Sequence, residues 1–253
     1  MTALNGRHAL ITGGGSGIGA ATARMLAAEG VKVSLLGRRI EALEGVARDI
    51  GASAFACDVT DRAAMEAAFA AARDANGPFD FVILNAGIGD SAPFMRTTRE
   101  MFDAIIATNL TAVFDGAQLA LPDLLIGDDK RLIVVASVAG LKGGAYAAPY
   151  VASKHGVVGL VKSLALEFAK THLTVNAVCP AFVDTPMVDD SAARISRVTK
   201  RSDDESRAAL AALNANGRLV TADEVAASIV HLCQPSSRSI NGALVTIDGG
   251  TTA

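Results

Sequence analysis

The only two tyrosines of the chain stand in the stretch "AYAAPYVASK", residues 145–154, and a lysine follows the second of them after four residues. Side chains four residues apart on a helix share one face, so Tyr150 and Lys154 can approach the same ligand. A phenol keeps its proton near neutrality because its reference pKa is about 10, and a cation within reach lowers such a pKa by about 1–3 units. The pair therefore favours proton transfer at a substrate oxygen. Tyr146 has no lysine at this spacing and is expected to form a pocket wall.

A glycine-rich turn, "TGGGSGIG" at residues 12–19, directly follows a short apolar run and opens a segment of helical period. The free N–H groups and the positive dipole end of such a helix receive a pyrophosphate. The spacing that fits without strain is Gly13-x-x-x-Gly17-x-Gly19 rather than the general dinucleotide fingerprint. A tight strand-to-helix connection without a ligand is the alternative, but the strand before the turn and the helix after it favour a nucleotide site.

The second apolar run ends in "LLGRR", where an NAD site would carry a carboxylate for the adenosine ribose. Gly37 takes that position and Arg38 follows, so the site offers a guanidinium suited to a 2′-phosphate. NADP(H) is therefore the favoured cofactor and NAD(H) the alternative; Arg38 could also be a solvated residue of a first helical turn. Asp58, at the end of the third run, is placed either to accept the adenine amino group or to cap a helix.

Short apolar runs alternate with longer Ala-rich segments whose apolar positions recur every three or four residues. The runs predict parallel strands that are buried on both faces. They span residues 8–12, 31–36, 53–57, 79–84, 131–137, 173–179 and 243–247. Right-handed crossovers between such strands give an α/β fold, a Rossmann-type doubly wound sheet in three α/β/α layers, which binds ligands beyond the carboxyl ends of its strands. Later helices are expected near residues 98–126, 149–170 and 222–232, the last with a capping box at Thr221 and Glu224.

The composition predicts one domain over residues 1–253, since 51% hydrophobic content supports a large core. A formal charge of −3, with 23 basic and 26 acidic residues spread along the chain, argues against a nucleic-acid or anionic-membrane partner. The three cysteines are far apart and the four histidines form no i,i+4 pair, so buried thiols are expected and a metal is not. A polar start and the lack of an apolar run near the ~20 residues of a membrane span predict a cytoplasmic protein.

Further polar residues complete a recognisable pattern. Ser137 stands thirteen residues before Tyr150 at the end of the fifth run, and "ATNL" offers Asn109. The glycine turn, the "NAG" at 85–87 and the "NAVCPAFVDTPM" at 176–187 occur in the same order along the chain. By the order and spacing of these motifs, the chain resembles the short-chain dehydrogenase/reductase family over its whole length.

The resemblance implies an oxidoreductase that interconverts a ketone and a secondary alcohol. Tyr150 would be the general acid in reduction and the base in oxidation, and Lys154 would lower its pKa and hold the nicotinamide ribose. Ser137 would donate to the substrate oxygen, and Asn109 would keep a water in a proton relay. The implied cofactor site consists of Gly13, Ser16, Gly17, Ile18, Gly19, Arg38, Asp58, Val59, Asn85, Ala86, Gly87, Tyr150, Lys154, Pro180, Val183 and Thr185. Family members commonly form tetramers through the helices near 98–126 and 149–170 and the C-terminal strand, so a homotetramer is expected.

The implied substrate pocket is apolar and uncharged. Its walls are Ile88, Phe94, Val138, Ala139, Tyr146, Phe182 and Met187. The family's 3-hydroxybutyrate dehydrogenases hold a carboxylate with polar and basic residues where this chain has Ala139 and Ala147, so a small free acid is disfavoured. A ketone on a longer or thioester-linked chain is favoured, with the 3-oxoacyl thioester reductases as the leading comparison. A sugar or polyol dehydrogenase and a cofactor-binding regulator without catalysis are the alternatives.

Residues 184–217, named the flap from here on, are polar and charge-dense. They are expected to form a mobile cover with a helix or two over the substrate mouth. The stretch 191–201 carries Arg194, Arg197, Lys200 and Arg201 and no acid. These charges are expected either to pair with the three acids at 203–205 or to form a basic edge that meets the phosphates of a coenzyme A or carrier-protein thioester.

One position departs from the family pattern, which usually has Pro-Gly where this chain has Pro180-Ala181. If that position requires a positive φ, an alanine there costs about 1 kcal/mol or more. The predicted contacts of Val183 and Thr185 with the nicotinamide depend on this segment.

Overall fold

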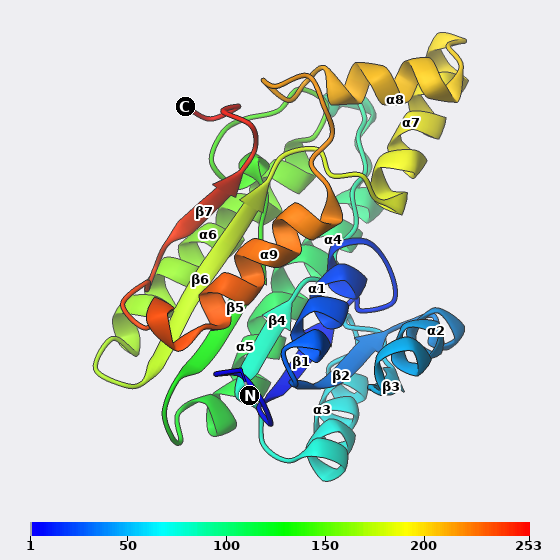
Figure 1. The fold of residues 1–253 in the computed structure, drawn as a ribbon. Helices are drawn as coiled ribbons and strands as arrows, with labels where there is room; N and C mark the ends of the chain where they lie inside the picture. Colours follow the sequence, from blue (N-terminus) through cyan, green and yellow to red (C-terminus); the bar gives the residue numbers. More distant parts are fainter. Residues whose placement is uncertain (1) are drawn as a thin grey trace.

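The computed structural model describes residues 2–253, and in them it shows an all-parallel sheet with the strand order β3-β2-β1-β4-β5-β6-β7. The strands are β1 (His8–Thr12), β2 (Lys32–Gly37), β3 (Ser53–Ala56), β4 (Phe81–Leu84), β5 (Lys130–Val135), β6 (Leu173–Pro180) and β7 (Leu244–Ile247). The order reverses between β1 and β4, which confirms the predicted doubly wound sheet (Figure 1). In such a sheet the ligand crevice is expected beyond the carboxyl ends of these two strands.

Helices cover both faces of the sheet. They are α1 (Gly17–Ala28), α2 (Ile40–Ile50), α3 (Arg62–Asn76), α4 (Arg99–Ile106), α5 (Ala112–Leu124), α6 (Ala148–Glu167), α7 (Pro186–Thr199), α8 (Asp203–Ala211) and α9 (Ala222–Cys233). The helices α1, α2 and α9 pack on one face, whereas α3, α5 and α6 pack on the other. The three-layer arrangement is therefore the predicted one (Figure 1).

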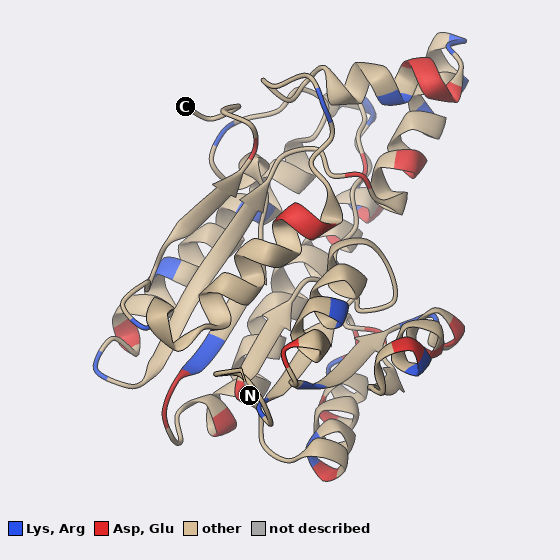
Figure 2. Cartoon of the chain, in the orientation of Figure 1, with Lys and Arg blue, Asp and Glu red and all other residues tan. Residues whose placement is uncertain are grey.

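The strands are apolar on both sides because each side meets a helical layer. In β1, Leu10 packs into the core that includes α3 and α5, and its neighbours Ala9 and Ile11 pack into the core that includes α1 and α9. Successive side chains of a strand point to opposite faces, so a strand between two layers reads as a continuous apolar run. Figure 2 agrees, because the charged residues gather on helices and loops and few lie on the strands.

The helix predicted near residues 98–126 is divided into three parts. Between α4 and α5 the chain makes a π-helical turn, η2 (Ala107–Thr111), which contains Asn109. Such single π turns are frequent at functional sites. The continuous run Arg99–Leu124 is long and apolar enough to cross a membrane by length and composition alone. In the fold its α5 part instead contributes to the core on one face of the sheet, as a core helix does.

The flap consists of α7 and α8, and its two ends are joined to each other. Val183 and Val220 form a parallel bridge. The N–H of Asp184 donates to the Val220 carbonyl at 2.8 Å, and the N–H of Val220 donates to the Phe182 carbonyl at 2.9 Å. The predicted helices are therefore present, and they leave and rejoin the body of the protein at one place. The mobility of the flap stays a prediction.

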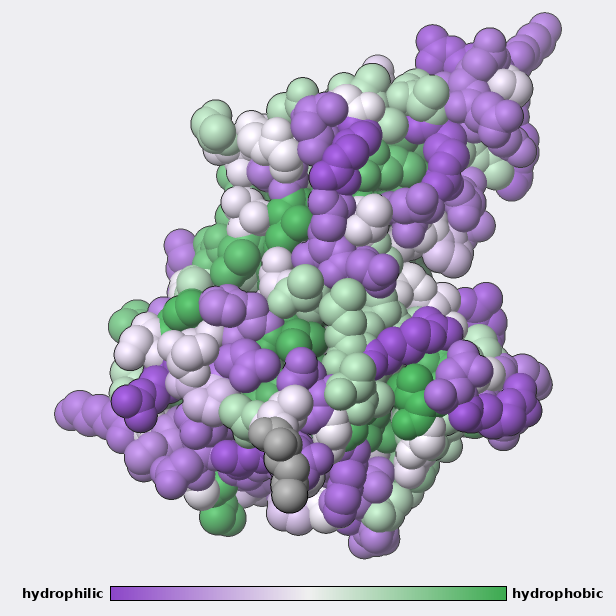
Figure 3. All heavy atoms as spheres, viewed as in Figure 1, coloured by the Kyte–Doolittle hydropathy of each residue, from purple (hydrophilic) through white to green (hydrophobic). Residues whose placement is uncertain are grey.

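The flap has a small apolar core of its own. Val188, Ala192 and Leu210 are buried between α7 and α8, apart from the two large cores beside the sheet. Its outer surface is hydrophilic and projects beyond the carboxyl ends of the strands (Figures 1 and 3). The flap thus packs as a separate unit above the crevice.

A buried ionic cluster fixes the opposite end of the sheet. The carboxylate of Asp80, just before β4, accepts hydrogen bonds at 2.9 Å from Lys130 Nζ, Arg7 Nη1 and the backbone N–H of His8. Burial alone would raise the pKa of Asp80, but the hydrogen bonds from Lys130, His8 and Arg7 hold that pKa below its ordinary value. The cluster joins β1, β4 and β5.

We expect Asp80→Asn to lower the free energy of unfolding at pH 7 by about 3 kcal/mol, because it leaves the buried Lys130 without its counter-charge. Urea denaturation measures this loss. Since the folded pKa is depressed, the contribution is present above the unfolded pKa of about 4 and is lost as pH falls through the folded pKa. The difference between wild type and variant should therefore shrink as pH falls below about 4. Asp49→Asn, in an exposed pair with Arg24, is the control and should change stability by about 0.5 kcal/mol or less.

Candidate active site

The chain turns sharply between β1 and α1 and leaves a cradle for an anion. Gly13 and Gly17 have φ angles of 68° and 52°, which disfavour any side chain. A Cβ atom at Gly19 would lie 2.3 Å from the carbonyl oxygen of Gly13, so the helix start packs directly on the turn. The side chain of the N-cap residue Ser16 makes no capping hydrogen bond. The first N–H groups of α1, which have no partner within the helix, and the Ser16 hydroxyl together suit a phosphate.

The ends of β1 and β4 are bound to each other beside this turn. The Thr12 hydroxyl oxygen accepts from the N–H groups of Asn85 and Ala86 at 2.9 and 3.0 Å. In return, the Asn85 side-chain amide donates to the carbonyls of Thr12 and Gly13 at 2.9 and 3.2 Å. Asn85 of the NAG motif therefore joins the ends of the two neighbouring strands.

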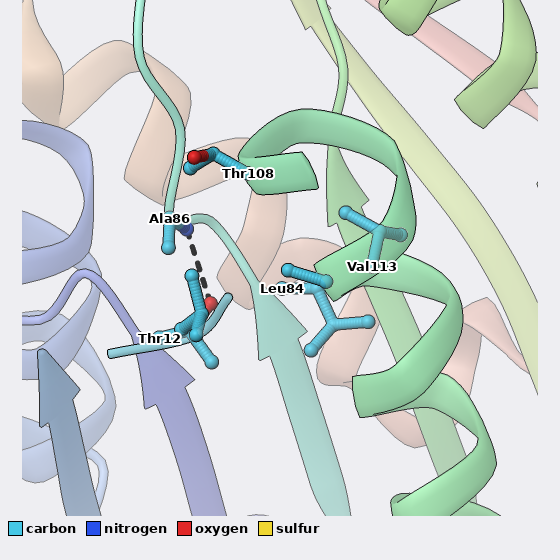
Figure 4. Close-up of a pocket in the computed structure, with 7 residues that line it drawn as sticks. Thr12, Leu84, Ala86, Thr108 and Val113 are labelled. Atoms are coloured by element: carbon cyan, nitrogen blue, oxygen red, sulfur yellow. Dashed lines mark hydrogen bonds between the residues drawn. The ribbon is translucent and has the colours of Figure 1, made fainter. Parts of the chain in front are cut away.

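A cavity of about 10 Å³, room for about one water, lies behind this junction. Its lining residues are Thr12, Val59, Leu84, Ala86, Thr108, Ala112 and Val113 (Figure 4). It brings together Val59 and Ala86, two residues predicted to contact the cofactor. Thr108 was missed by the sequence reasoning, because a single threonine inside a helical segment carries no signal of its own.

The residues predicted for the adenosine end follow β2 and β3. The carboxylate of Asp58 accepts from the Thr60 N–H at 2.9 Å and from the Thr60 hydroxyl at 2.8 Å. These two bonds, with a smaller contribution from the positive charge of Arg38, hold the pKa of Asp58 below its ordinary value. Asp58 does not cap the following helix, because Asp61 is the N-cap of α3. An exposed guanidinium and an ionised carboxylate thus lie near each other at this end.

The pair on which the chemistry depends lies on α6. Lys154 is 5% exposed, and its Nζ donates to the Val135 carbonyl at 2.9 Å and lies 5.7 Å from the centre of the Tyr150 ring. Burial lowers the pKa of Lys154 to about 8. Burial also raises the pKa of Tyr150, and a hydrogen bond with Ser137 opposes that rise. Lys154 is not among the groups that shift the pKa of Tyr150 in this structure, so the lowering of that pKa by Lys154 stays a prediction.

Ser137 lies two residues beyond β5, at the N-cap of the short turn η3 (Val138–Gly140). Its hydroxyl oxygen accepts from the Ala139 N–H at 3.1 Å, which orients the side chain. The hydroxyl is also the hydrogen-bond partner of Tyr150. Three elements, β5, η3 and α6, therefore bring Ser137, Tyr150 and Lys154 together.

Asn109 is fully buried and its side chain is already engaged. Its Oδ1 accepts from the Ile88 N–H at 2.9 Å and its Nδ2 donates to the Ile88 carbonyl at 2.9 Å. Nδ2 also reaches the Ser153 hydroxyl at 3.3 Å, and Ser153 donates to the Tyr150 carbonyl at 2.7 Å. Both polar atoms of the Asn109 side chain are therefore engaged. The predicted relay water would have to bind the main-chain carbonyl of Asn109. The sequence reasoning missed Ser153, although a polar residue between Tyr150 and Lys154 was the available signal.

The flap contacts both halves of the site. Cγ2 of Thr185 lies 2.9 Å from where a Cβ of Gly17 would be, so the flap begins directly against the glycine turn. Sδ of Met187 lies 3.4 Å from where a Cβ of Gly89 would be. The predicted residues Thr185 and Met187 are thereby placed over the turn and over the loop that follows β4.

Two basic residues of the stretch 191–201, Arg194 and Arg201, have acidic neighbours in different places. Arg194 pairs with Asp90 at 2.8 Å and donates to the Gly89 carbonyl at 3.0 Å. The prediction that the acids at 203–205 neutralise this charge is therefore wrong for Arg194. Pairing with the acids at 203–205 is favoured for Arg201, because its charge helps to lower the pKa of Glu205.

The predicted pocket walls differ in exposure. Phe94 and Tyr146 are 76% and 67% exposed, whereas Phe182 packs on the small core of the flap. Tyr146 has a φ of 65°, and its carbonyl accepts from the Ala92 N–H at 2.8 Å. Ala181 is not among the residues with positive φ, so the strain anticipated there does not arise.

A model of the short chain dehydrogenase family matches residues 7–196. The chain belongs to this family. A curated relative, the 3-oxoacyl-acyl-carrier-protein reductase MabA of Mycobacterium tuberculosis, is 37% identical over 244 residues, 96% of this short-chain dehydrogenase and 92% of the relative. The D-beta-hydroxybutyrate dehydrogenase of Cupriavidus necator is 37% identical over 99% of each chain. A variant of actinorhodin polyketide ketoreductase, solved with NADPH, superposes with a TM-score of 0.93 at 35% identity over 99% of each chain.

We expect Gly19→Ala to destabilise this short-chain dehydrogenase by about 1–3 kcal/mol and to weaken nucleotide binding, because the added methyl group forces the turn open. Thermal unfolding and fluorescence titration with NADPH measure the two effects. Gly45→Ala is the control, since Gly45 lies inside α2 with no atom within 4 Å of its Cβ position. It should stabilise the helix by about 0.5–1 kcal/mol and leave binding unchanged. Equal behaviour of the two variants would contradict the role given to the turn.

Proposed function

We propose that this short-chain dehydrogenase interconverts a ketone and a secondary alcohol on an apolar or acyl-thioester substrate with NADP(H). The observation that carries the proposal is the convergence of Ser137, Tyr150 and Lys154 at the carboxyl end of the sheet, beside the glycine turn. The names of the relatives agree in reaction class, since they include a 3-oxoacyl reductase, a hydroxybutyrate dehydrogenase and a polyketide ketoreductase.

The residues present fit a dinucleotide. The turn at Gly13 and Gly17 and the start of α1 would hold the pyrophosphate, because side chains there would fill the cradle. Lys154 Nζ lies 3.9 Å from where a Cβ of Gly87 would be, which places an ammonium beside the floor of the crevice for the nicotinamide ribose. When bound, the nicotinamide supplies or accepts the hydride. The resemblance also supports contacts from Ile18, Pro180 and Val183.

Tyr150 would handle the proton. In reduction its hydroxyl gives a proton to the carbonyl oxygen of the substrate, and the Ser137 hydroxyl donates a second hydrogen bond to that oxygen. In oxidation Tyr150 takes the proton back. The raised pKa of Tyr150 keeps the phenol protonated near neutrality, which is the form that donates a proton in reduction. Lys154 is a cation below a pH of about 8.

The preference for NADP(H) is supported by Arg38 and by a bound NADPH in the similar ketoreductase. Gly37 leaves the ribose-binding position without a carboxylate. The nearby Asp58 carboxylate is bonded to Thr60, which leaves the exposed Arg38 guanidinium available for the 2′-phosphate.

An apolar or thioester-linked substrate is supported by the uncharged walls and by the relatives that act on 3-oxoacyl and polyketide chains. Because Arg194 is paired with Asp90, the basic edge that would meet thioester phosphates is reduced to Arg197, Lys200 and Arg201. Ile88, Val138 and Ala139 would face the reacting carbon, and Phe94 and Tyr146 the entrance. A panel of ketones and 3-oxoacyl thioesters, followed at the reduced-nicotinamide absorbance, decides between substrate classes and excludes catalysis if none reacts.

We also infer a cytoplasmic homotetramer that assembles through α4, α5 and α6. Large apolar side chains are exposed on these three helices, at Phe102, Phe114 and Leu166. Association would remove them from water. Sedimentation equilibrium measures the assembly directly, and a monomer would refute the inference.

We expect Tyr150→Phe to reduce turnover to below about one per cent, because it removes the proton donor, while NADPH affinity stays within severalfold of wild type. Steady-state assays and binding titrations measure the two quantities. Residual turnover of several per cent in Tyr150→Phe would refute the assignment.

We expect Lys154→Ala to lower both turnover and NADPH affinity. In the wild type NADPH affinity should fall above pH 8, where Lys154, with a pKa of about 8, loses its charge. In Lys154→Ala this pH dependence should be absent.

We expect Arg38→Ala to weaken NADP(H) binding by about 1–3 kcal/mol and to leave NAD(H) nearly unaffected, since only NADP(H) carries the phosphate. A Cβ atom at Gly37 would lie 3.5 Å from Leu43, an ordinary contact, so the position accepts a side chain. The double variant Gly37→Asp, Arg38→Ala should therefore prefer NAD(H). Competitive binding of the two cofactors measures the preference, and equal losses for both would make Arg38 a plain surface residue.

A further inference from the structure

The flap touches the loop after β4 through one ion pair. Arg194 in the middle of α7 donates from Nη1 to Asp90 Oδ1 at 2.8 Å and from Nη2 to the Gly89 carbonyl at 3.0 Å. Beside this contact, Sδ of Met187 lies against Gly89. Among the described residues the Arg194 Nε is buried and has no hydrogen-bond partner. The Arg194 guanidinium thus donates both to the Asp90 carboxylate and to the main-chain carbonyl of Gly89 in the same loop.

This loop is fixed at two further points. The Ala92 N–H donates to the Tyr146 carbonyl at 2.8 Å, which joins the loop to the segment leading into α6. At the start of the loop, the Ile88 N–H and carbonyl are both hydrogen-bonded to the buried side-chain amide of Asn109. Residues 88–92 are therefore held by Asn109 and by the segment that leads into α6, and the ion pair of Arg194 with Asp90 joins the flap to them.

The other ties of the flap do not involve the mouth. Its ends are paired with each other at Val183 and Val220. Arg207 on α8 pairs with Asp184 and Asp189, which are both flap residues. Thr185 lies against Gly17, and the Ala215 N–H donates to the Thr251 hydroxyl at 2.9 Å. These contacts anchor the base of the flap, whereas Arg194 and Met187 join α7 to the loop after β4.

We propose that Arg194 and Asp90 are positioning residues for the reaction: they hold the flap against residues 88–92 and so close the mouth over the bound substrate. The inference rests on the proposed function in that it takes the mouth to be the route to Tyr150. The pair is partly exposed, with side-chain exposures of 34% for Arg194 and 43% for Asp90. Such a pair is weak enough to open during turnover and is screened by salt.

Hydrogen exchange on the whole enzyme with NADPH and no ketone tests the latch itself. We expect Arg194→Ala to speed exchange of the amides of α7 about 3-fold to 10-fold, the range for a half-exposed charge-assisted pair. Asp90→Asn removes the charge but keeps an acceptor for the Ser91 N–H, so it should act in the same direction and more weakly. The double variant should exchange no faster than Arg194→Ala alone, since both remove one interaction. Arg197→Ala, which removes an exposed arginine one turn further along α7, is the matched control and should leave exchange unchanged.

Kinetics then separates positioning from a general loss of structure. We expect KM for the ketone to rise about 3-fold to 10-fold in Arg194→Ala, with kcat unchanged or higher, because an open mouth holds substrate poorly and releases product readily. High salt should raise the wild-type KM towards that of the variant. Unchanged exchange in both Arg194→Ala and Asp90→Asn, an equal effect of Arg197→Ala on the exchange of α7, or a fall in kcat at constant KM would overturn the proposal. If wild type reduces no ketone, the proposed function fails while the exchange measurements still decide the latch.

Discussion

A single threonine hydroxyl at the end of β1 accepts two N–H groups from the end of β4, and the site is laid out around that junction. At the point where the strand order reverses, neighbouring strands send their helices to opposite faces, so backbone groups lose their ladder partners just where a crevice opens. Thr12 and Asn85 supply those partners from their side chains. The floor of the crevice is thereby fixed before any ligand arrives, and the glycine turn has a rigid wall to pack against.

The reacting side of the crevice is set by burial. A chain of hydrogen bonds runs from the backbone of Ile88 through Asn109 and Ser153 to the backbone of Tyr150, and all of its side chains are buried. In such surroundings a charge is costly, so the neutral forms of both ionisable groups gain. The pKa of Tyr150 rises and that of Lys154 falls to about 8. The same dry environment strengthens every hydrogen bond that the phenol makes to a reacting oxygen.

The sequence predicts the strands to within a residue or two, because runs buried on both faces leave a continuous apolar signal. It could not predict the pair of Arg194 and Asp90, which are 104 residues apart and meet only through tertiary packing. The π turn around Asn109 and the left-handed backbone of Tyr146 were likewise beyond reach, since neither has a local residue signature. The roles of the site residues stay predictions that residue patterns and geometry support.

The paired ends of the flap have a consequence for how this scaffold can diversify. Val183 and Val220 lie side by side, so the flap leaves and rejoins the body of the protein at one place. The helices between these two residues pack on a core of their own. The entropic cost of closing a loop grows only slowly with its length, so longer or shorter inserts between Val183 and Val220 put little strain on β6 or α9. Selection can therefore reshape what enters the mouth while the machinery beneath it is inherited unchanged.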